Sequence, residues 1–219
     1  MNLQLSPTEI RVIGCLIEKA ITTPDQYPLS INALTNACNQ KSNRDPTMAL
    51  TERTVQDTID ALVKKHLVLE RSGFGSRVPK YQHRFCNTGF GSLEFTPQAT
   101  AILCELMLRG PQTPGELRGR AVRMAEIRDV TEVETTLQAL ATREDGPFVV
   151  KLPREPGRRD SRYAHLFGGP IEIEAEPEPV TEPMPAHAQG PSLAERVAKL
   201  EEQVATLQAE LAELKEGSG

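Results

Sequence analysis

The chain has 219 residues, of which 38% are hydrophobic and 4% aromatic, with no Trp. This composition suits the helical core of one large domain or two small ones. No apolar run approaches the ~20 residues of a membrane span, and the N-terminus lacks the features of a secretory signal. The four cysteines form no CxxC pair, which argues against a disulfide framework and favours a cytoplasmic protein.

The formal net charge of −5 is unevenly distributed. Residues 1–90 carry 11 Lys and Arg against 8 Asp and Glu, and residues 91–168 carry 11 of each. Residues 169–219 carry 3 against 11, so the acidity lies in the last segment. The mildly basic first segment permits contact with a nucleic acid without requiring it.

Three helices and a hairpin are predicted for the first segment. The helices follow three N-cap residues, Ser6, Ser30 and Thr51, and Glu9 completes a capping box with Ser6. Apolar residues recur at helical spacing after each cap: Ile10, Ile13, Leu16 and Ile17; Ile31, Leu34 and Ala37; Val55, Ile59, Leu62 and Val63. Strands at 67–71 and 77–85 flank the Gly-rich turn at 73–76. This order is typical of a winged helix-turn-helix, with the third helix in the recognition position.

The same pattern recurs in the second segment. Phe95-Thr96-Pro97 repeats Leu5-Ser6-Pro7 at an offset of 90 residues. Tyr81, His83 and Phe85 recur as Tyr163, His165 and Phe167 at an offset of 82. A pattern shared by cap, core and hairpin indicates duplication. We therefore predict an α+β, mostly helical fold with two tandem winged-helix domains, at residues 1–90 and 91–168.

Two further segments are predicted after these domains. Residues 169–191 are acidic and Pro-rich, which predicts a disordered linker. Residues 192–216 have heptad spacing, which predicts a coiled-coil helix that favours two strands. Its apolar positions are Leu193, Val197, Leu200, Val204, Leu207, Leu211 and Leu214. We favour self-association through this stripe over a helix that packs on its own chain.

Three motifs carry a resemblance to a known family. They are Leu5-Ser6-Pro7-Thr8-Glu9-Ile10, the loop Asn39-Gln40-Lys41-Ser42-Asn43-Arg44-Asp45-Pro46, and Tyr81-Gln82-His83-Arg84-Phe85. Over about residues 3 to 168 the chain closely resembles the YceH-like family of bacterial proteins. The resemblance implies a duplicated winged-helix fold in a cytoplasmic protein. It implies no particular activity.

Three surfaces are candidates for DNA contact: the 39–46 loop, the third helix and the two hairpin wings. Their candidate residues are Lys41, Asn43, Arg44, Arg53, Gln56, Lys64, Arg71, Arg77, Lys80, Arg154, Arg158, Arg159 and Arg162. Arg and Gln side chains read base edges, whereas Lys and wing Arg side chains suit phosphates.

Each candidate has a structural alternative. The loop also fits a purely structural role, in which Asn43 and Asp45 form side-chain-to-backbone turns. The third helix also fits a solvated face, because Asp57 and Asp60 would repel DNA. The wings also fit ordinary charged turns, although the four arginines between Arg154 and Arg162 favour function.

Catalysis is not indicated. His66, His83, His165 and His187 lack metal-ligand spacing, and neither a Gly-rich phosphate loop nor a nucleophile elbow is present. We expect no enzyme activity, no cofactor and no metal. The leading hypothesis is a dimeric DNA-binding protein, such as a transcriptional regulator. The alternative is a protein-interaction scaffold built from winged helices, like those of chromosome-condensation complexes, with another protein as partner.

Overall fold

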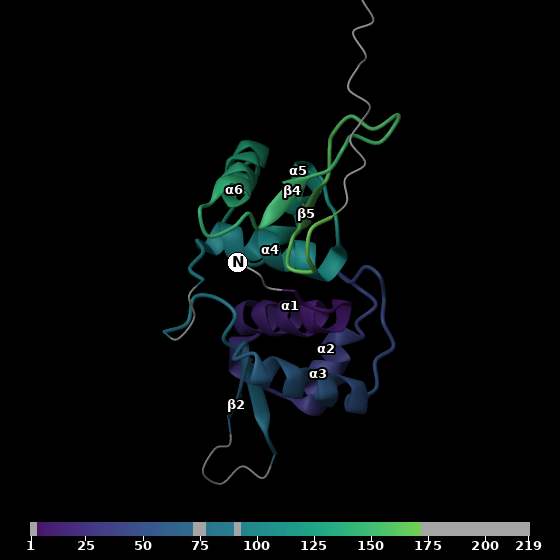
Figure 1. Ribbon diagram of the computed structural model, residues 1–219, viewed down its shortest axis with the longest axis vertical. Coiled ribbons are helices and arrows are strands. Elements are labelled where there is room, and N and C mark those ends of the chain that lie inside the picture. The colour runs from purple at the N-terminus through teal and green to yellow at the C-terminus, as the bar shows by residue number, and fades with distance from the viewer. Residues whose placement is uncertain (1–3, 72–77, 90–92, 172–219) are drawn as a thin grey trace, which may run out of the picture. The chain divides into compact units, whose positions relative to one another are not determined.

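The computed structural model describes residues 4–71, 78–89 and 93–171 (Figure 1). This part of the chain is α+β and mostly helical, with two small antiparallel sheets. The helices are α1 (Pro7–Thr22), α2 (Ile31–Cys38), α3 (Glu52–Lys64), α4 (Pro97–Arg109), α5 (Pro114–Ala121) and α6 (Val130–Thr142), with a short 3₁₀ helix at Pro24–Gln26. The strands are β1 (Leu29–Ser30), β2 (Val68–Arg71), β3 (Lys80–His83), β4 (Val149–Lys151) and β5 (Tyr163–His165). None of the described helices has the length and apolar content of a membrane span.

The predicted caps of the first three helices are confirmed. Ser6, Ser30 and Thr51 each accept a hydrogen bond from a backbone N–H in the first turn of the helix that follows. At α1 the capping box is complete, since the Glu9 carboxylate accepts from the Ser6 N–H at 2.8 Å. Thr113 and Glu116 form a second capping box at α5. Short polar side chains therefore set the helix starts in both segments.

The sheets repeat one arrangement. In the first, β3 lies between β1 and β2, and Leu29 pairs with Tyr81. In the second, β4 pairs with β5, and Gln112 forms an isolated bridge to Tyr163. Tyr81 and Tyr163 occupy equivalent positions in the sequence repeat, at an offset of 82 residues. Both pair with the segment that precedes the second helix of their half, so the repeat is also visible in the strand pairing. The strand β1 was not predicted, because two residues are too short for a periodic signal.

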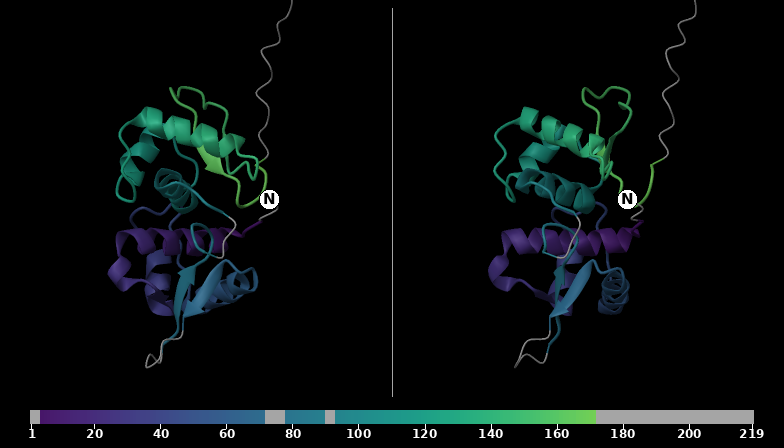
Figure 2. Two further views of the ribbon diagram at one scale, coloured as in Figure 1. Left: turned by 90° about the vertical axis from the view of Figure 1, so that its left-hand side faces the viewer. Right: turned by 60° about the vertical axis from the view of Figure 1, so that its left-hand side comes forward.

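Helices α1 and α4 pack against each other at the centre of the described residues. Helices α2 and α3 lie beyond α1, and α5 and α6 lie beyond α4 (Figures 1 and 2). As a result, every α1 residue from Glu9 to Glu18 is buried, and so is every α4 residue from Ala99 to Leu108. The contacts of α1 with α4 are made through Arg11, whose Nη2 donates to the Leu108 carbonyl oxygen at 3.4 Å, and through Gly14, which lies against Met107 and Leu108. A helix buried on all sides has no solvated stripe.

Corresponding residues of the two segments meet at this junction. Phe85 and Phe167 pack edge to face with ring centroids 5.0 Å apart. The Cys104 thiol donates to the Gly14 carbonyl oxygen at 3.3 Å, and these two residues are 90 positions apart, the offset of the helical repeat. Contacts between equivalent positions are the signature of a two-fold relation. The two segments therefore meet through residues that the sequence repeat makes equivalent.

Several predictions need correction or lie outside the described residues. Val63 was placed on the buried face of α3, but it is 37% exposed, because the buried arc of the helix extends from Ile59 toward Thr58 and Val63 lies just outside its other edge. All four cysteines are buried and free, in agreement with the expectation of no disulfide framework. The first wing tip, most of the predicted linker and the predicted coiled coil (192–216) are outside the described residues.

Candidate nucleic-acid interface

Helix α3 presents a polar face of mixed charge. Val55, Ile59 and Leu62 are fully buried, which turns the opposite side of the helix outward. The exposed side chains there are Arg53, Asp57, Asp60 and Lys64. Arg53 and Lys64 have no hydrogen-bond or ion-pair partner among the residues that the structure describes. The two cations are thus free to contact an anion, but the two carboxylates share their surface.

Gln56 is held by its neighbours. It is partly buried, its Nε2 donates to Asp60 Oδ1 at 2.8 Å, and its Oε1 accepts from the Tyr81 hydroxyl at 3.2 Å. Both ends of the amide are therefore occupied by α3 and β3. Reading an adenine edge would require Gln56 to give up these hydrogen bonds.

The 39–46 loop is organised by a buried arginine. Arg44 is 4% exposed, and its guanidinium forms a two-pronged contact with the Glu18 carboxylate, Nη1 to Oε1 at 3.1 Å and Nη2 to Oε2 at 2.5 Å. Its Nε donates to the Ala37 carbonyl oxygen at 3.0 Å. The side chain of Arg44 is 0% exposed, so none of it is available to a nucleic acid in this conformation. This role was not predicted, because an arginine in a polar loop is usually exposed.

Other residues of the loop also support the fold. Asn43 adopts the left-handed conformation at φ 53° and donates through Nδ2 to Glu105 Oε1 at 3.3 Å. Asn39 holds the approach to α3, since its Oδ1 accepts from the Leu50 N–H at 2.8 Å and its Nδ2 donates to the Leu50 carbonyl at 2.7 Å. For a purely structural loop, the sequence had suggested Asn43 and Asp45 as the residues that form these side-chain-to-backbone contacts. In the structure Asn39 forms them. Lys41 is exposed.

A charge network joins the two halves beneath this loop. Arg123, which follows α5, donates through Nη2 to Glu18 at 2.6 Å and to Glu105 at 2.7 Å. Burial alone would raise the pKa of Glu18, but Arg44 and then Arg123 outweigh it and hold that pKa at about 2. Glu18 is therefore ionised at neutral pH although it is almost fully buried. It serves as the common partner of two arginines, one from each half.

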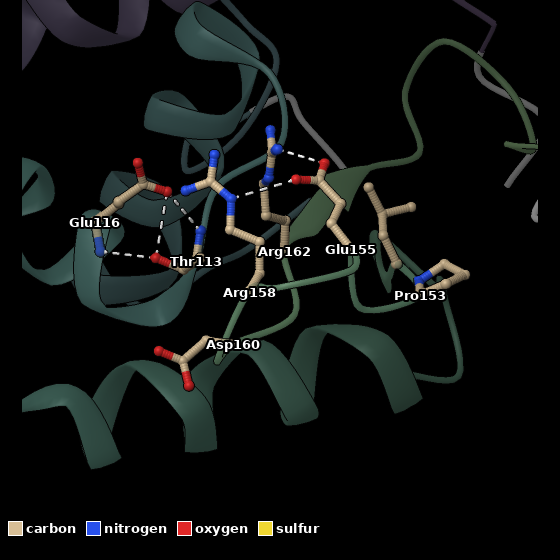
Figure 3. Close-up of a pocket in the computed structure, with 8 residues that line it drawn as sticks. Thr113, Glu116, Pro153, Glu155, Arg158, Asp160 and Arg162 are labelled. Carbon is tan, nitrogen blue, oxygen red and sulfur yellow. Dashed lines mark hydrogen bonds and ion pairs between the residues drawn. The ribbon is translucent and has the colours of Figure 1, made fainter. Parts of the chain in front are cut away.

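The second wing carries four arginines but also two acids. Figure 3 shows both acids, Glu155 and Asp160, with two of the arginines, Arg158 and Arg162. Glu155 lies between Arg158 and Arg162, with Arg158 Nε at 3.5 Å from Glu155 Oε2 and a closer hydrogen bond from Arg162. These residues and Thr113, Glu116 and Asp160 line a pocket of about 370 Å³. Arg154 and Arg159 are exposed and have no acidic partner among the described residues. Two of the four predicted wing cations are thus free, and two are partly neutralised.

The first wing is only partly described. Arg71 Nε donates to Gln82 Oε1 at 3.1 Å across the hairpin, and Lys80 is exposed in β3. Arg77 lies outside the described residues. The basic character predicted for this wing can be placed only at its base.

The repeated histidines, His83 in β3 and His165 in β5, are each half-buried. Burial lowers the pKa of His83 and of His165 to about 4. His165 Nδ1 accepts from the Phe167 N–H at 3.3 Å. Among the described residues, no cluster of His, Cys, Asp and Glu has the arrangement of a metal site.

Comparison with known proteins gives one consistent family. Residues 5–158 match the family described as "Protein of unknown function, DUF480". A UPF0502 protein of Aeromonas hydrophila is 57% identical over 211 residues, covering 96% of this chain and 94% of that protein. UPF0502 proteins of Vibrio vulnificus (57% identity, 98% and 97% coverage) and of an Enterobacter strain (56% identity, 96% coverage of each) are similar. The resemblance to YceH-like proteins agrees with these matches. The chain therefore belongs to the DUF480, or UPF0502, family of bacterial proteins of unknown function.

Proposed function

We propose that the chain is a cytoplasmic, non-enzymatic protein that binds DNA through two tandem winged-helix domains. The order of helix, short extended segment, two helices and antiparallel hairpin, which occurs twice, supports this proposal. A polar third helix followed by a basic hairpin is the arrangement that winged-helix proteins use on duplex DNA. Regulation of transcription would follow from sequence-specific binding.

The observation that carries the proposal is the set of exposed, unpaired cations on the expected elements. Within the described residues these are Arg53 and Lys64 on α3 and Arg154 and Arg159 on the second wing. Each can neutralise a phosphate without first leaving an acidic partner. Arg158 and Arg162 must be released from Glu155 to do the same. Arg44 is excluded from this set by its burial.

The test is fluorescence anisotropy of the full chain with mixed genomic duplex DNA across a salt series. We expect binding that weakens steeply as salt rises. The double variant Arg154→Ala and Arg159→Ala should flatten the plot of log K against log salt by about 0.9 for each phosphate that the variant no longer neutralises. Arg128→Ala is the matched control, since Arg128 is an exposed arginine of the same half outside the wing. Absence of binding at low salt would remove the proposal.

A second candidate function is supported by α6. The helix in the recognition position of the second half exposes Thr131, Thr135, Gln138 and Thr142, and Glu134 is the only charged residue of that face. A nearly uncharged surface lacks the phosphate contacts on which DNA binding depends, whereas a protein partner does not need them. A photoreactive residue at position 138 should then cross-link to one protein partner in cells. The predicted self-association through residues 192–216 would give each dimer two copies of the binding surface, for DNA or for a protein partner. Light scattering of the full chain measures its oligomeric state and so tests this prediction.

A further inference from the structure

A pocket lies at the junction of the two halves. Its volume is about 500 Å³, within the range of small-molecule sites. The first half contributes Lys19 from the end of α1 and Ser42 and Asn43 from the 39–46 loop. The second half contributes Arg120 from α5 and Arg123 just after it. The sequence alone gave no sign of this pocket, because its residues come from three separate segments.

The polar atoms of the pocket are mostly donors, and several lack a partner. Arg123 uses Nε and Nη2 on Glu105 and Glu18, which leaves its Nη1 without a hydrogen bond among the described residues. Arg120 uses Nη1 on Gln112, with Glu116 Oε1 at 3.6 Å from the same nitrogen, which leaves Nη2 without a hydrogen bond among the described residues. The Ser42 hydroxyl has no partner within the described part of the chain, and the Lys19 ammonium has only Glu18, at 3.4 Å.

The acids near the pocket are already occupied. Glu18 lines it but is engaged by Arg44 and Arg123, and Glu105 is engaged by Arg123 and Asn43. These two buried acids fix the Arg123 side chain in place, so its remaining N–H groups point in a defined direction. Arg120 is held by Gln112 and Glu116 instead. Preorganised guanidinium donors beside an ammonium and a hydroxyl are suited to phosphate oxygens.

We propose that this junction pocket binds a small phosphorylated anion of up to nucleotide size. Lys19 and Ser42 would hold it from the first half, and Arg120 and Arg123 from the second. A ligand in this position contacts both halves at once, so it would also stabilise their packing. This site is separate from the α3 and wing surfaces, and it does not depend on DNA binding.

The experiment is isothermal titration calorimetry of the full chain with two probes, sodium pyrophosphate and AMP, at constant ionic strength. We expect saturable one-site binding, and the stronger probe distinguishes a bare phosphate site from a nucleotide site. Ser42→Glu places a carboxylate in the pocket and should abolish binding, and its far-ultraviolet circular dichroism should be unchanged because Ser42 is exposed and has no partner among the described residues. Lys19→Ala should weaken binding at least about tenfold, as expected for a hydrogen bond to a charged group.

Lys41→Ala is the matched control, since Lys41 is exposed, belongs to the same loop as Ser42 and does not line the pocket. It should retain the affinity of the unmodified chain. Absence of binding by both probes overturns the proposal. Equal weakening by Lys19→Ala and Lys41→Ala also overturns it, because it would mean diffuse attraction to the surface. Duplex DNA affinity, measured in parallel, should be the same in Lys19→Ala and the unmodified chain, because Lys19 lies on none of the candidate DNA surfaces.

Discussion

Replacing Arg44 with methionine should destabilise the chain by about 3–5 kcal/mol, the usual cost of removing one partner from a buried ion pair. The substitution removes both hydrogen bonds to Glu18 and also the donors to the Ala37 and Asn43 carbonyl oxygens, at 3.0 and 2.8 Å. Glu18 then stays buried with Arg123 as its remaining close partner, at 2.6 Å. The expected decrease is a large fraction of the total stability of a typical domain.

Urea unfolding at neutral pH, followed by circular dichroism, measures this decrease. The control is Arg128→Met, which removes an 80% exposed side chain with a surface pair to Glu132 and should cost less than about 1 kcal/mol. The double variant Glu18→Gln and Arg44→Met should be more stable than Arg44→Met alone, because it no longer buries an underpaired charge. If Arg44→Met were as stable as Arg128→Met, the buried ion pair of Arg44 and Glu18 would not stabilise the fold. The same conclusion would follow if the double variant were less stable than Arg44→Met alone.

Three other substitutions test separate parts of the fold. Because the pKa of His83 is lowered from 6.5 to about 4, the folded state resists its protonation, so stability should fall by about 3 kcal/mol as pH drops through that window. His83→Phe should flatten this acid dependence in urea titrations at several pH values, and an acid dependence equal to that of the unmodified chain would contradict the prediction. Gly14→Val should cost about 1–3 kcal/mol in thermal unfolding, since even a Cβ at this position would lie 3.0 Å from Leu108 Cδ2, and a cost near zero would mean that α4 yields easily. Thr51→Ala should cost about 1 kcal/mol through loss of the α3 cap, and Thr51→Ser, which keeps the hydroxyl, should recover most of it in the same assay.

The sequence was sufficient for what depends on local chemistry. The caps at Ser6 and Thr51, the helical order and the equivalence of Tyr81 with Tyr163 were all predictable, because each rests on neighbouring residues or on the repeat. The packing of α1 against α4 was not predictable, since Arg11 and Gly14, the α1 residues that meet α4, give no sign in the sequence of a helix partner. The burial of Arg44 was missed for the same reason. Its partner Glu18, and Arg123 on the same carboxylate, are distant in sequence, and a single sequence gives no sign of which charges meet.

For the candidate nucleic-acid interface too, the sequence did not show which charges pair with each other. From the sequence, Arg158 and Arg159 were equivalent wing cations. In the structure they differ, because Arg158 pairs with Glu155 whereas Arg159 has no acidic partner among the described residues. A count of charges along a hairpin cannot tell which of them are neutralised by a neighbour. Geometry is needed to decide which arginines of such a turn are available.

The packing of α1 against α4 also determines where the two candidate recognition helices, α3 and α6, lie. Helices α3 and α6 lie on opposite sides of that pair, so they face away from each other (Figures 1 and 2). A straight, rigid partner cannot lie along both helices at the same time. Anything bound to α3 and anything bound to α6 must approach from opposite directions. The chain therefore has two separate helix faces, the mixed-charge face of α3 and the nearly uncharged face of α6.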